Sequence, residues 1–311
     1  MVKENIEIIS YGEPLVSLYS PKDRSLTENL PLSRGWGGDT LDTTLALSKL
    51  GYSVAFLTRI SNDEFGDNLT TLLRNTGSDT SLLQKDLNHS TGICFVSYKG
   101  EKHNFIYYRK NSAACFIDAE AINWELVRSA RVLHLSSISQ GISRNALEVS
   151  FRLMEFARKH GLLVSYDINY RPPLWNRETA RAVILHTISE YVDILQMTDE
   201  ELLLLGWEAD IDVFIRRLSR APRLTALKLG ERGCLLLRGD ERVEVGAFKV
   251  EVADTVGAGD AFDAGLIAGV LEGLELEELG LRANAVAALT CRDVGPLRAQ
   301  PGRDDVDEFL R

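Results

Sequence analysis

Short apolar runs alternate with amphipathic segments along most of the chain. The runs are apolar at consecutive positions, which is the pattern of parallel strands buried on both faces. They cover residues 6–10, 53–58, 131–136, 162–167, 192–197 and 224–229. The amphipathic segments predict helices over 144–160, 177–190 and 212–220. This alternation predicts an α/β fold, with a doubly wound sheet that carries helices on both faces.

Two regions break this rhythm and predict a second, smaller β-sheet. Residues 14–20 and 26–34 are strand-like and flank a turn-rich stretch, whereas 92–99 and 102–109 flank a turn and predict a β-hairpin. We expect these strands, inserted at about 13–35 and 90–112, to cover a site as a lid. A decorative edge or a dimer surface is the alternative. All of 1–311 is expected to form a single domain.

Composition and charge narrow the class of protein. The chain has 311 residues, of which 45% are apolar and 26% charged, as in soluble globular proteins. The sequence contains no apolar run as long as a membrane span, and its first residues lack a signal-peptide pattern. The net charge of −10 disfavours nucleic acid or an anionic membrane as a partner. The four scattered cysteines indicate reduced thiols in a cytoplasmic protein, and we expect no zinc site.

The strongest candidate chemistry lies in VADTVGAGDAFDAG, Val252–Gly265. Gly257 and Gly259 precede an apolar helix, where their backbone can turn several N–H groups toward one point and form an anion hole for phosphoryl oxygens. Asp260 falls in the first helical turn, within reach of a hydroxyl in front of that hole. Accepting the hydroxyl's proton while donors stabilise a moving phosphoryl group is what phosphoryl transfer requires. The alternative is an ordinary helix start whose Asp interacts with the dipole.

Two other nucleotide-binding motifs are absent. The dinucleotide fingerprint GxGxxG would need glycine at position 262, where Phe262 stands. The sequence also contains no Walker A pattern. A Rossmann dehydrogenase or a P-loop enzyme is therefore disfavoured.

Three segments resemble one known family in the expected order. DTVGAGDAFDAG (254–265) resembles the C-terminal signature of the ribokinase-like (PfkB) carbohydrate kinases. GWGGDTLDTT (35–44) is similar to the family's N-terminal glycine pair, and KLGERGC (228–234) to its segment beside the nucleotide. The resemblance covers essentially the whole chain. It implies a three-layer α/β/α kinase fold with a small β lid and a reaction that depends on ATP and Mg²⁺.

The resemblance also implies roles for individual residues. Asp260 is the expected base, and the N–H groups of Gly257, Ala258 and Gly259 are the expected anion hole. Glu201 matches the glutamate of the family's NxxE motif and is expected to act on Mg²⁺ through water. A K⁺ site near Thr255 is left open. The residues expected at the ATP site are Lys228, Gly230, Gly233, Thr255, Gly257, Gly259 and Asn284.

Within the family, the chain most resembles 2-keto-3-deoxygluconate kinases. SYDINYRPPLWN (165–176), YYRKNSAA (107–114) and GGDTL (37–41) carry this resemblance. Arginines at a strand end and at the end of the proposed lid suit a substrate carboxylate, because guanidinium binds carboxylate in a bidentate manner. The expected product is the 6-phosphate. The residues expected to bind the sugar acid are Gly37, Gly38, Asp42, Tyr107, Arg109, Arg171 and Asp260.

One departure leaves the substrate open. Asp42 stands where the family usually has Asn, and an ionised aspartate cannot donate a hydrogen bond and would repel a carboxylate. The alternatives are a family kinase acting on fructose, on a related ketose or sugar acid, or on a nucleoside. A non-catalytic sugar- or nucleotide-binding regulator is a further alternative. A homodimer formed through the lid strands is expected from the resemblance and from the exposed strand edges.

Overall fold

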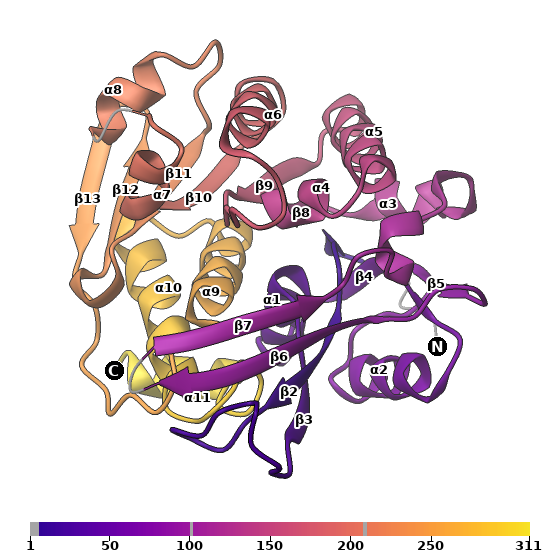
Figure 1. Cartoon of the computed structure of the whole chain (residues 1–311). Coiled ribbons are helices and arrows are strands. Elements are labelled where there is room, and N and C mark those ends of the chain that lie inside the picture. The colour runs from indigo at the N-terminus through magenta and orange to yellow at the C-terminus, as the bar shows by residue number, and fades with distance from the viewer. Residues whose placement is uncertain (1–5, 100–101, 208–209) are drawn as a thin grey trace.

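The computed structural model describes residues 6–99, 102–207 and 210–311. In this part of the chain, nine strands form a large sheet in the order β13-β12-β11-β10-β9-β8-β1-β4-β5 (Figure 1). Every pairing from β11 to β5 is parallel, and β12 and β13 extend the sheet in antiparallel fashion. The strands are β1 (Ile8–Tyr11), β4 (Val54–Ser61), β5 (Leu83–Asp86), β8 (Val132–Ser136), β9 (Leu163–Asp167), β10 (Ile194–Thr198), β11 (Leu224–Lys228), β12 (Cys234–Arg238) and β13 (Glu241–Val245).

Helices cover both faces of this sheet, and so the predicted doubly wound α/β architecture is confirmed (Figure 1). Apolar side chains of α1, α9, α10 and α11 pack on one face, and those of α3, α5, α6 and α8 on the other. The helices are α1 (Asp39–Lys49), α2 (Glu64–Asn75), α3 (Trp124–Ser129), α4 (Ser137–Gly141), α5 (Arg144–His160), α6 (Arg177–Glu190), α7 (Asp199–Leu204), α8 (Ile211–Arg216), α9 (Ala258–Glu272), α10 (Leu276–Thr290) and α11 (Arg303–Phe309).

The strand order places a topological switch point at β1. The chain runs from β1 toward β4 and β5 on one side, and later from β8 toward β11 on the other. Ligands of open α/β sheets bind beyond the carboxyl ends of the strands at such a point. The order of the strands therefore locates the site before any side chain is considered.

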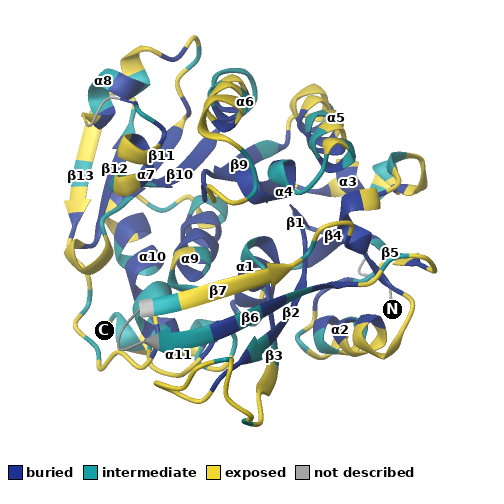
Figure 2. Cartoon of the chain, in the orientation of Figure 1, coloured by how far each residue is buried: buried dark blue, intermediate teal, exposed yellow. Residues whose placement is uncertain are grey.

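A second sheet of four described strands, in the order β3-β2-β6-β7, lies across that end of the large sheet (Figure 1). It consists of β2 (Leu15–Tyr19), β3 (Ser33–Gly37), β6 (Gly92–Lys99) and β7 (Lys102–Tyr108). The hairpin strands β6 and β7 lie where the sequence predicts them, and their turn, Gly100–Glu101, lies outside the described residues. We call this sheet the lid. Figure 2 shows that β7 is largely exposed along its length.

Two predicted elements were wrong in their bounds. The strand expected over 26–34 lies at Ser33–Gly37. Residues 26–28 form a turn and 29–32 have no regular structure, and the proline at position 31 offers no N–H for a strand ladder. The helix expected over 212–220 is the shorter Ile211–Arg216, capped by the Asp210 side chain. Within the described residues, no helix has the length and apolar character needed to cross a membrane.

Helix α9 is buried on nearly every side because it lies between the sheet, α1 and α10. Its glycines permit a close approach: a Cβ placed on Gly265 would lie 2.8 Å from the Cα of Ala283 in α10. Such a distance is too short for carbon atoms, and so a side chain at position 265 would force the two helices apart. This packing fixes where the first turn of α9 lies relative to the sheet.

We therefore expect Gly265→Ala to lower the free energy of unfolding by about 1–3 kcal/mol. Gly246→Ala is the matched control, because a Cβ there meets nothing within 4 Å. Denaturant unfolding of both variants measures the difference. Equal stabilities would show that α9 and α10 separate at no cost.

Candidate functional site

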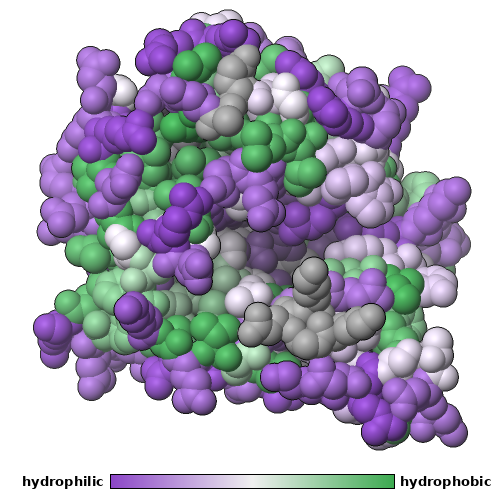
Figure 3. Space-filling model, turned by 60° about the vertical axis from the view of Figure 1, so that its left-hand side comes forward, coloured by the Kyte–Doolittle hydropathy of each residue, from purple (hydrophilic) through white to green (hydrophobic). Residues whose placement is uncertain are grey.

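Polar side chains gather beyond the carboxyl ends of the parallel strands. Glu13 follows β1, Ser136 ends β8, Asp167 ends β9 and Lys228 ends β11. Asp167 lies opposite Ser136 in the sheet register, so these groups meet at one edge. Figure 3 shows a hollow on this side of the molecule with mainly hydrophilic residues at its floor.

The start of α9 forms a concentration of free N–H groups in this region. Gly257 has a left-handed φ of 82°, which favours glycine, and a Cβ there would lie 2.5 Å from Pro296. The helix has no side-chain cap, and within the described residues the N–H groups of Gly257, Gly259 and Asp260 have no acceptor. Ala258 differs from the expectation, since its N–H donates to the carbonyl of Thr255 at 3.2 Å. The geometry suits an anion at this helix end.

Asp260 lies in the first turn of α9 and is partly exposed. Its surroundings raise its pKa to about 8: burial is the main cause, and the negative charges of Asp39 and Asp167 add to it. The positive charges of Lys228 and Arg171 act in the opposite direction. A carboxyl with this pKa is a stronger base than an ordinary aspartate.

Asp167 and Asp263 flank Asp260 and form an acidic cluster, in which one oxygen of each residue lies within 4.8 Å of the others. Lys228 already supplies a positive charge there, because its Nζ lies 3.0 Å from Asp167 and 3.2 Å from Asp263. Burial raises the pKa of Asp263 and so does the nearby charge of Asp167, whereas Lys228 lowers it. Lys228, which the sequence predicts to contact ATP, thus also forms ion pairs with two carboxylates of the acidic cluster.

Gly37 and Gly38 connect β3 to α1, and the first turn of α1 brings two further acids, Asp39 and Asp42, to the site. Gly38 has φ 132°, and a Cβ on it would strike the carbonyl of Glu13. The next residue, Asp39, accepts hydrogen bonds from the Ser136 hydroxyl and from the Asn169 amide at 3.4 Å. Burial raises the pKa of Asp39.

Asp42 lies one turn further along α1 and is 4% exposed. Its Oδ1 has no hydrogen-bond partner among the described residues. Burial holds the pKa of Asp42 well above its usual range, and the charges of Asp260 and Asp39 add to this effect. The site therefore favours the neutral carboxylic acid, which can donate a hydrogen bond as the amide of asparagine does.

Arg109 is paired, contrary to the free guanidinium that the sequence suggests. Its Nε donates to Glu13 at 2.6 Å, and a second nitrogen contacts the same carboxylate. Glu13 is 1% exposed and also accepts a hydrogen bond from the Ser112 hydroxyl. The guanidinium stacks over the Tyr107 ring, 5.3 Å from its centroid. Much of the charge of Arg109 is therefore balanced inside the protein.

Arg171 differs from Arg109 in its surroundings. It is exposed, and in the described part of the chain its guanidinium contacts only the carbonyl of Tyr170, at 3.3 Å. Its charge opposes the rise in the pKa of Asp260 and the rise, caused mainly by burial, in the pKa of Tyr107 in the lid. Arg171 thus lies near both groups, and its guanidinium has no carboxylate partner among the described residues.

The remaining predicted residues have mainly structural contacts. Both oxygens of Glu201 accept main-chain N–H groups, from Tyr170 and Thr198, each at 2.8 Å. The Asn284 amide donates to the carbonyls of Val245 and Gly246, each at 3.1 Å. Gly230 and Gly233 shape the turn after β11, and Thr255 precedes the α9 start. A Cβ placed on Gly37 would lie 2.9 Å from the Ser17 hydroxyl oxygen.

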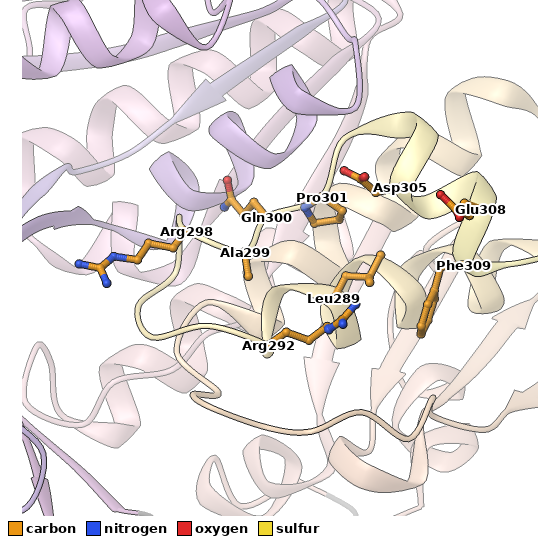
Figure 4. Close-up of a pocket in the computed structure, with 9 residues that line it drawn as sticks. All are labelled: Leu289, Arg292, Arg298, Ala299, Gln300, Pro301, Asp305, Glu308 and Phe309. Carbon is orange, nitrogen blue, oxygen red and sulfur yellow. The ribbon is translucent and has the colours of Figure 1, made fainter.

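One cavity lies apart from this site, between the end of α10, α11 and the segment that joins them (Figure 4). Its volume is about 750 Å³, and the predicted site residues do not line it. The lining residues are Leu289, Arg292, Arg298, Ala299, Gln300, Pro301, Asp305, Glu308 and Phe309. Both signs of charge are present, so its composition favours no ligand class.

Comparison with known proteins agrees with this geometry. The model of the pfkB family carbohydrate kinases matches residues 5–302. The chain belongs to this family. The kinase is 33% identical to probable fructokinase-2 of Arabidopsis thaliana over 98% of this chain and 95% of that one. It is 30% identical to an uncharacterized sugar kinase from Pyrococcus horikoshii, with a TM-score of 0.86 over 98% and 99% of the two chains.

The comparisons confirm the family and the ribokinase-like α/β/α fold but not the narrower substrate prediction. A 2-dehydro-3-deoxygluconokinase from Thermotoga maritima matches with a TM-score of 0.91 over 98% of this chain and 99% of that one, at 22% identity. At this identity the likeness shows the fold alone. Further relatives, from rice and maize, are named fructokinases.

Sequence reasoning missed three residues of this candidate site, Asp39, Asp167 and Glu13. Asp39 follows the glycine pair directly, at a helix start beside a switch point. Asp167 ends a buried strand, in the SYD of 165–167. Position at the carboxyl end of a parallel strand was the available signal, and it applies to Asp167 as well as to Arg171. Glu13 carried no such signal, because its partner lies 96 residues away.

The contacts of Asn284 generate a test of whether it is chiefly structural. Asn284→Ala should lower the free energy of unfolding by about 1–3 kcal/mol, because two carbonyls lose their donor. Asn75→Ala, at an exposed position of α2, controls for helix propensity. Denaturant titration compares the two variants. An unchanged stability with a raised KM for ATP would instead support the predicted nucleotide contact.

Proposed function

We propose that this kinase transfers the γ-phosphoryl group of ATP to the terminal hydroxyl of a neutral ketohexose of the fructose class. The observation that carries this proposal is the pairing of Arg109 with the buried Glu13. A sugar acid would need a guanidinium free to bind its carboxylate, and most of this one's charge is already neutralised.

The other groups at the site favour a neutral polyhydroxylated ligand. Asp39 and Asp260 place two carboxyl groups beside the sugar, and carboxyl oxygens accept hydrogen bonds from hydroxyls. In their ionised form they would also repel a substrate carboxylate. Asp42 in its neutral form donates a hydrogen bond, so its replacement of the family's Asn suits a sugar oxygen. The relatives named fructokinases, at 30–33% identity, support the same substrate class.

The proposed chemistry follows from the positions of the charges. Asp260 takes the proton from the attacking hydroxyl, and the N–H groups of Gly257 and Gly259 at the start of α9 stabilise the phosphoryl oxygens. The Pyrococcus horikoshii kinase has been solved with ATP. Mg²⁺ supplies charge neutralisation on the phosphates when bound, and Glu201 is proposed to orient its water shell. Positioning and electrostatics supply most of the acceleration.

2-Keto-3-deoxygluconate is the second candidate substrate. The observation that favours it is the exposed guanidinium of Arg171, which has no carboxylate partner among the described residues and lies near both Asp260 and Tyr107. The two candidates differ by one negative charge on the substrate. A substitution that changes the charge at or beside either arginine should therefore affect turnover of the acid sugar more than turnover of fructose.

The test measures ADP release with ATP and Mg²⁺ on fructose, ribose, adenosine, gluconate, 2-keto-3-deoxygluconate and its galactonate epimer. We expect the highest kcat/KM on fructose. Glu13→Gln should raise the ratio of kcat/KM for the keto-deoxy acid to that for fructose at least about tenfold, because it frees the charge of Arg109. The ratio of two kcat/KM values measured on the same variant does not depend on the fraction of that variant that is folded, because the concentration of active enzyme cancels.

Arg171→Ala is the companion variant. It should leave fructose turnover within about threefold of wild type while reducing any turnover of the acid sugars. A wild-type preference for the keto-deoxy acid that Arg171→Ala abolishes would replace the proposal with the second candidate. Nucleotide binding without any turnover would favour the regulator.

The raised pKa of Asp260 predicts the pH dependence of the reaction. Because this pKa is about 8, the carboxylate that accepts the proton prevails only above that pH, and kcat/KM for the sugar should rise with pH up to about 8. Asp260→Asn should lower kcat by about 10²–10⁴-fold. Its residual activity should lack the limb near pH 8; a limb that persists would assign the titration to another group.

A further inference from the structure

The carboxylate of Asp254 joins the lid to the loop that begins α9. Its side chain is completely buried, and each oxygen accepts two hydrogen bonds. Oδ1 accepts from His103 at 2.8 Å and from the Val256 N–H at 3.0 Å. Oδ2 accepts from the Tyr98 hydroxyl at 3.3 Å and from the Gly295 N–H at 2.8 Å. Two donors come from the lid and two from segments beside the anion hole.

These four donors belong to the lid and to the anion-hole loop, two parts of the chain that must be held together during the proposed phosphoryl transfer. Val256 immediately precedes Gly257, and Pro296, which follows Gly295, packs against Gly257. The same carboxylate thus holds the anion-hole loop on one side and the far end of the β6–β7 hairpin on the other. Because Asp254 is buried, loss of a donor would leave a charged oxygen short of a partner.

The near end of the hairpin is held at a second point, by Arg109 on Glu13. Between the two points, alternate residues of β7 form a stacked row on the face of the lid that carries the buried Cys94 and Val96. His103 and Phe105 stack with centroids 6.0 Å apart, and Phe105 and Tyr107 with centroids 6.1 Å apart. Arg109 then lies over Tyr107. The row runs from the anion-hole side to the sugar side.

We propose that His103 is a positioning residue for the transfer reaction, which ties the lid to the anion hole through Asp254. The Nε2–H of His103 donates to the carboxylate, and Tyr98 adds a weaker bond. When both hydrogen bonds are formed, the position of the lid over the sugar is fixed relative to the N–H groups of Gly257 and Gly259, which hold the phosphate. This inference rests on the proposed role of the Gly257–Gly259 loop.

As a consequence, closure of the lid over the sugar is coupled to the arrangement of the anion-hole loop that holds the phosphoryl group. A lid fixed over the loop excludes water from the phosphoryl group and keeps the hydroxyl as the acceptor. A lid that is free of Asp254 would still bind the sugar through Arg109 and Tyr107 at its near end. It would do so loosely, and water would compete for the phosphoryl group.

The chain offers a matched pair of variants at this position. His103→Phe keeps an aromatic ring beside Phe105 but removes the N–H donor, whereas His103→Gln keeps a donor of similar reach and removes the ring. We expect His103→Phe to lower kcat/KM for the sugar at least about tenfold, the usual weight of a hydrogen bond to a charged group. His103→Gln should remain within about threefold of wild type. His103→Phe should also raise ADP release without sugar relative to ADP release with it.

Asn104→Ala is the control, because Asn104 is exposed, neighbours His103 and makes none of these contacts. It should match wild type. Wild-type kinetics and coupling in His103→Phe would overturn the proposal. Equal losses in His103→Phe and His103→Gln with unchanged coupling would also overturn it, because the N–H donor would then not matter.

Hydrogen exchange of the ligand-free protein separates this inference from the proposed function. His103→Phe should lose protection both in the β6–β7 hairpin and at Val256, whatever substrate the kinase uses. If wild type phosphorylates no sugar of the panel but exchange responds in this way, the proposed substrate fails and the connection stands. If exchange changes only in the hairpin, Asp254 does not transmit the contact and the inference fails.

Discussion

The start of α9 has no side-chain cap, and the rest of the proposed site depends on this constraint. The N–H groups of Gly257, Gly259 and Asp260 have no acceptor among the described residues, which leaves them available to an anion. Packing of Gly265 against α10 fixes the axis of the helix, and Pro296 against Gly257 fixes its first turn. This packing holds the donors in place, as preorganised electrostatic stabilisation of the proposed phosphoryl group requires.

A helix start that attracts anions also has to tolerate the acids beside it. Asp167, Asp260 and Asp263 are close enough to repel one another, and Lys228 is the group that offsets this repulsion. Burial and the charges of neighbouring carboxylates raise the pKa of Asp260 and of Asp42, because both effects disfavour the ionised form. The same crowding that disfavours the ionised state of Asp260 makes its carboxylate more basic, which suits the proton abstraction proposed for it.

The sequence allowed the large sheet to be predicted because its parallel strands are apolar on both faces, which periodicity detects directly. It misplaced the second lid strand, because the polar stretch before Ser33–Gly37 shows no period that marks where pairing begins. The family motifs located Asp260 and its glycines. They could not show that Arg109 is paired with Glu13, since a motif specifies residue types, whereas the charge at a site depends on partners that are distant in the chain.

The difference between the residue types in a motif and the net charge that their partners leave decides which substrate such a site favours. Two arginines near a cleft suggest an anionic substrate only while both charges are free, and Glu13 removes most of one of them. Arg171 remains, but it is exposed, so water screens its charge more than that of a buried guanidinium. The balance of charge at the sugar side therefore depends less on the arginines themselves than on one buried glutamate after β1. A family member that lacked this glutamate would present the same arginines to its substrate with a different net charge.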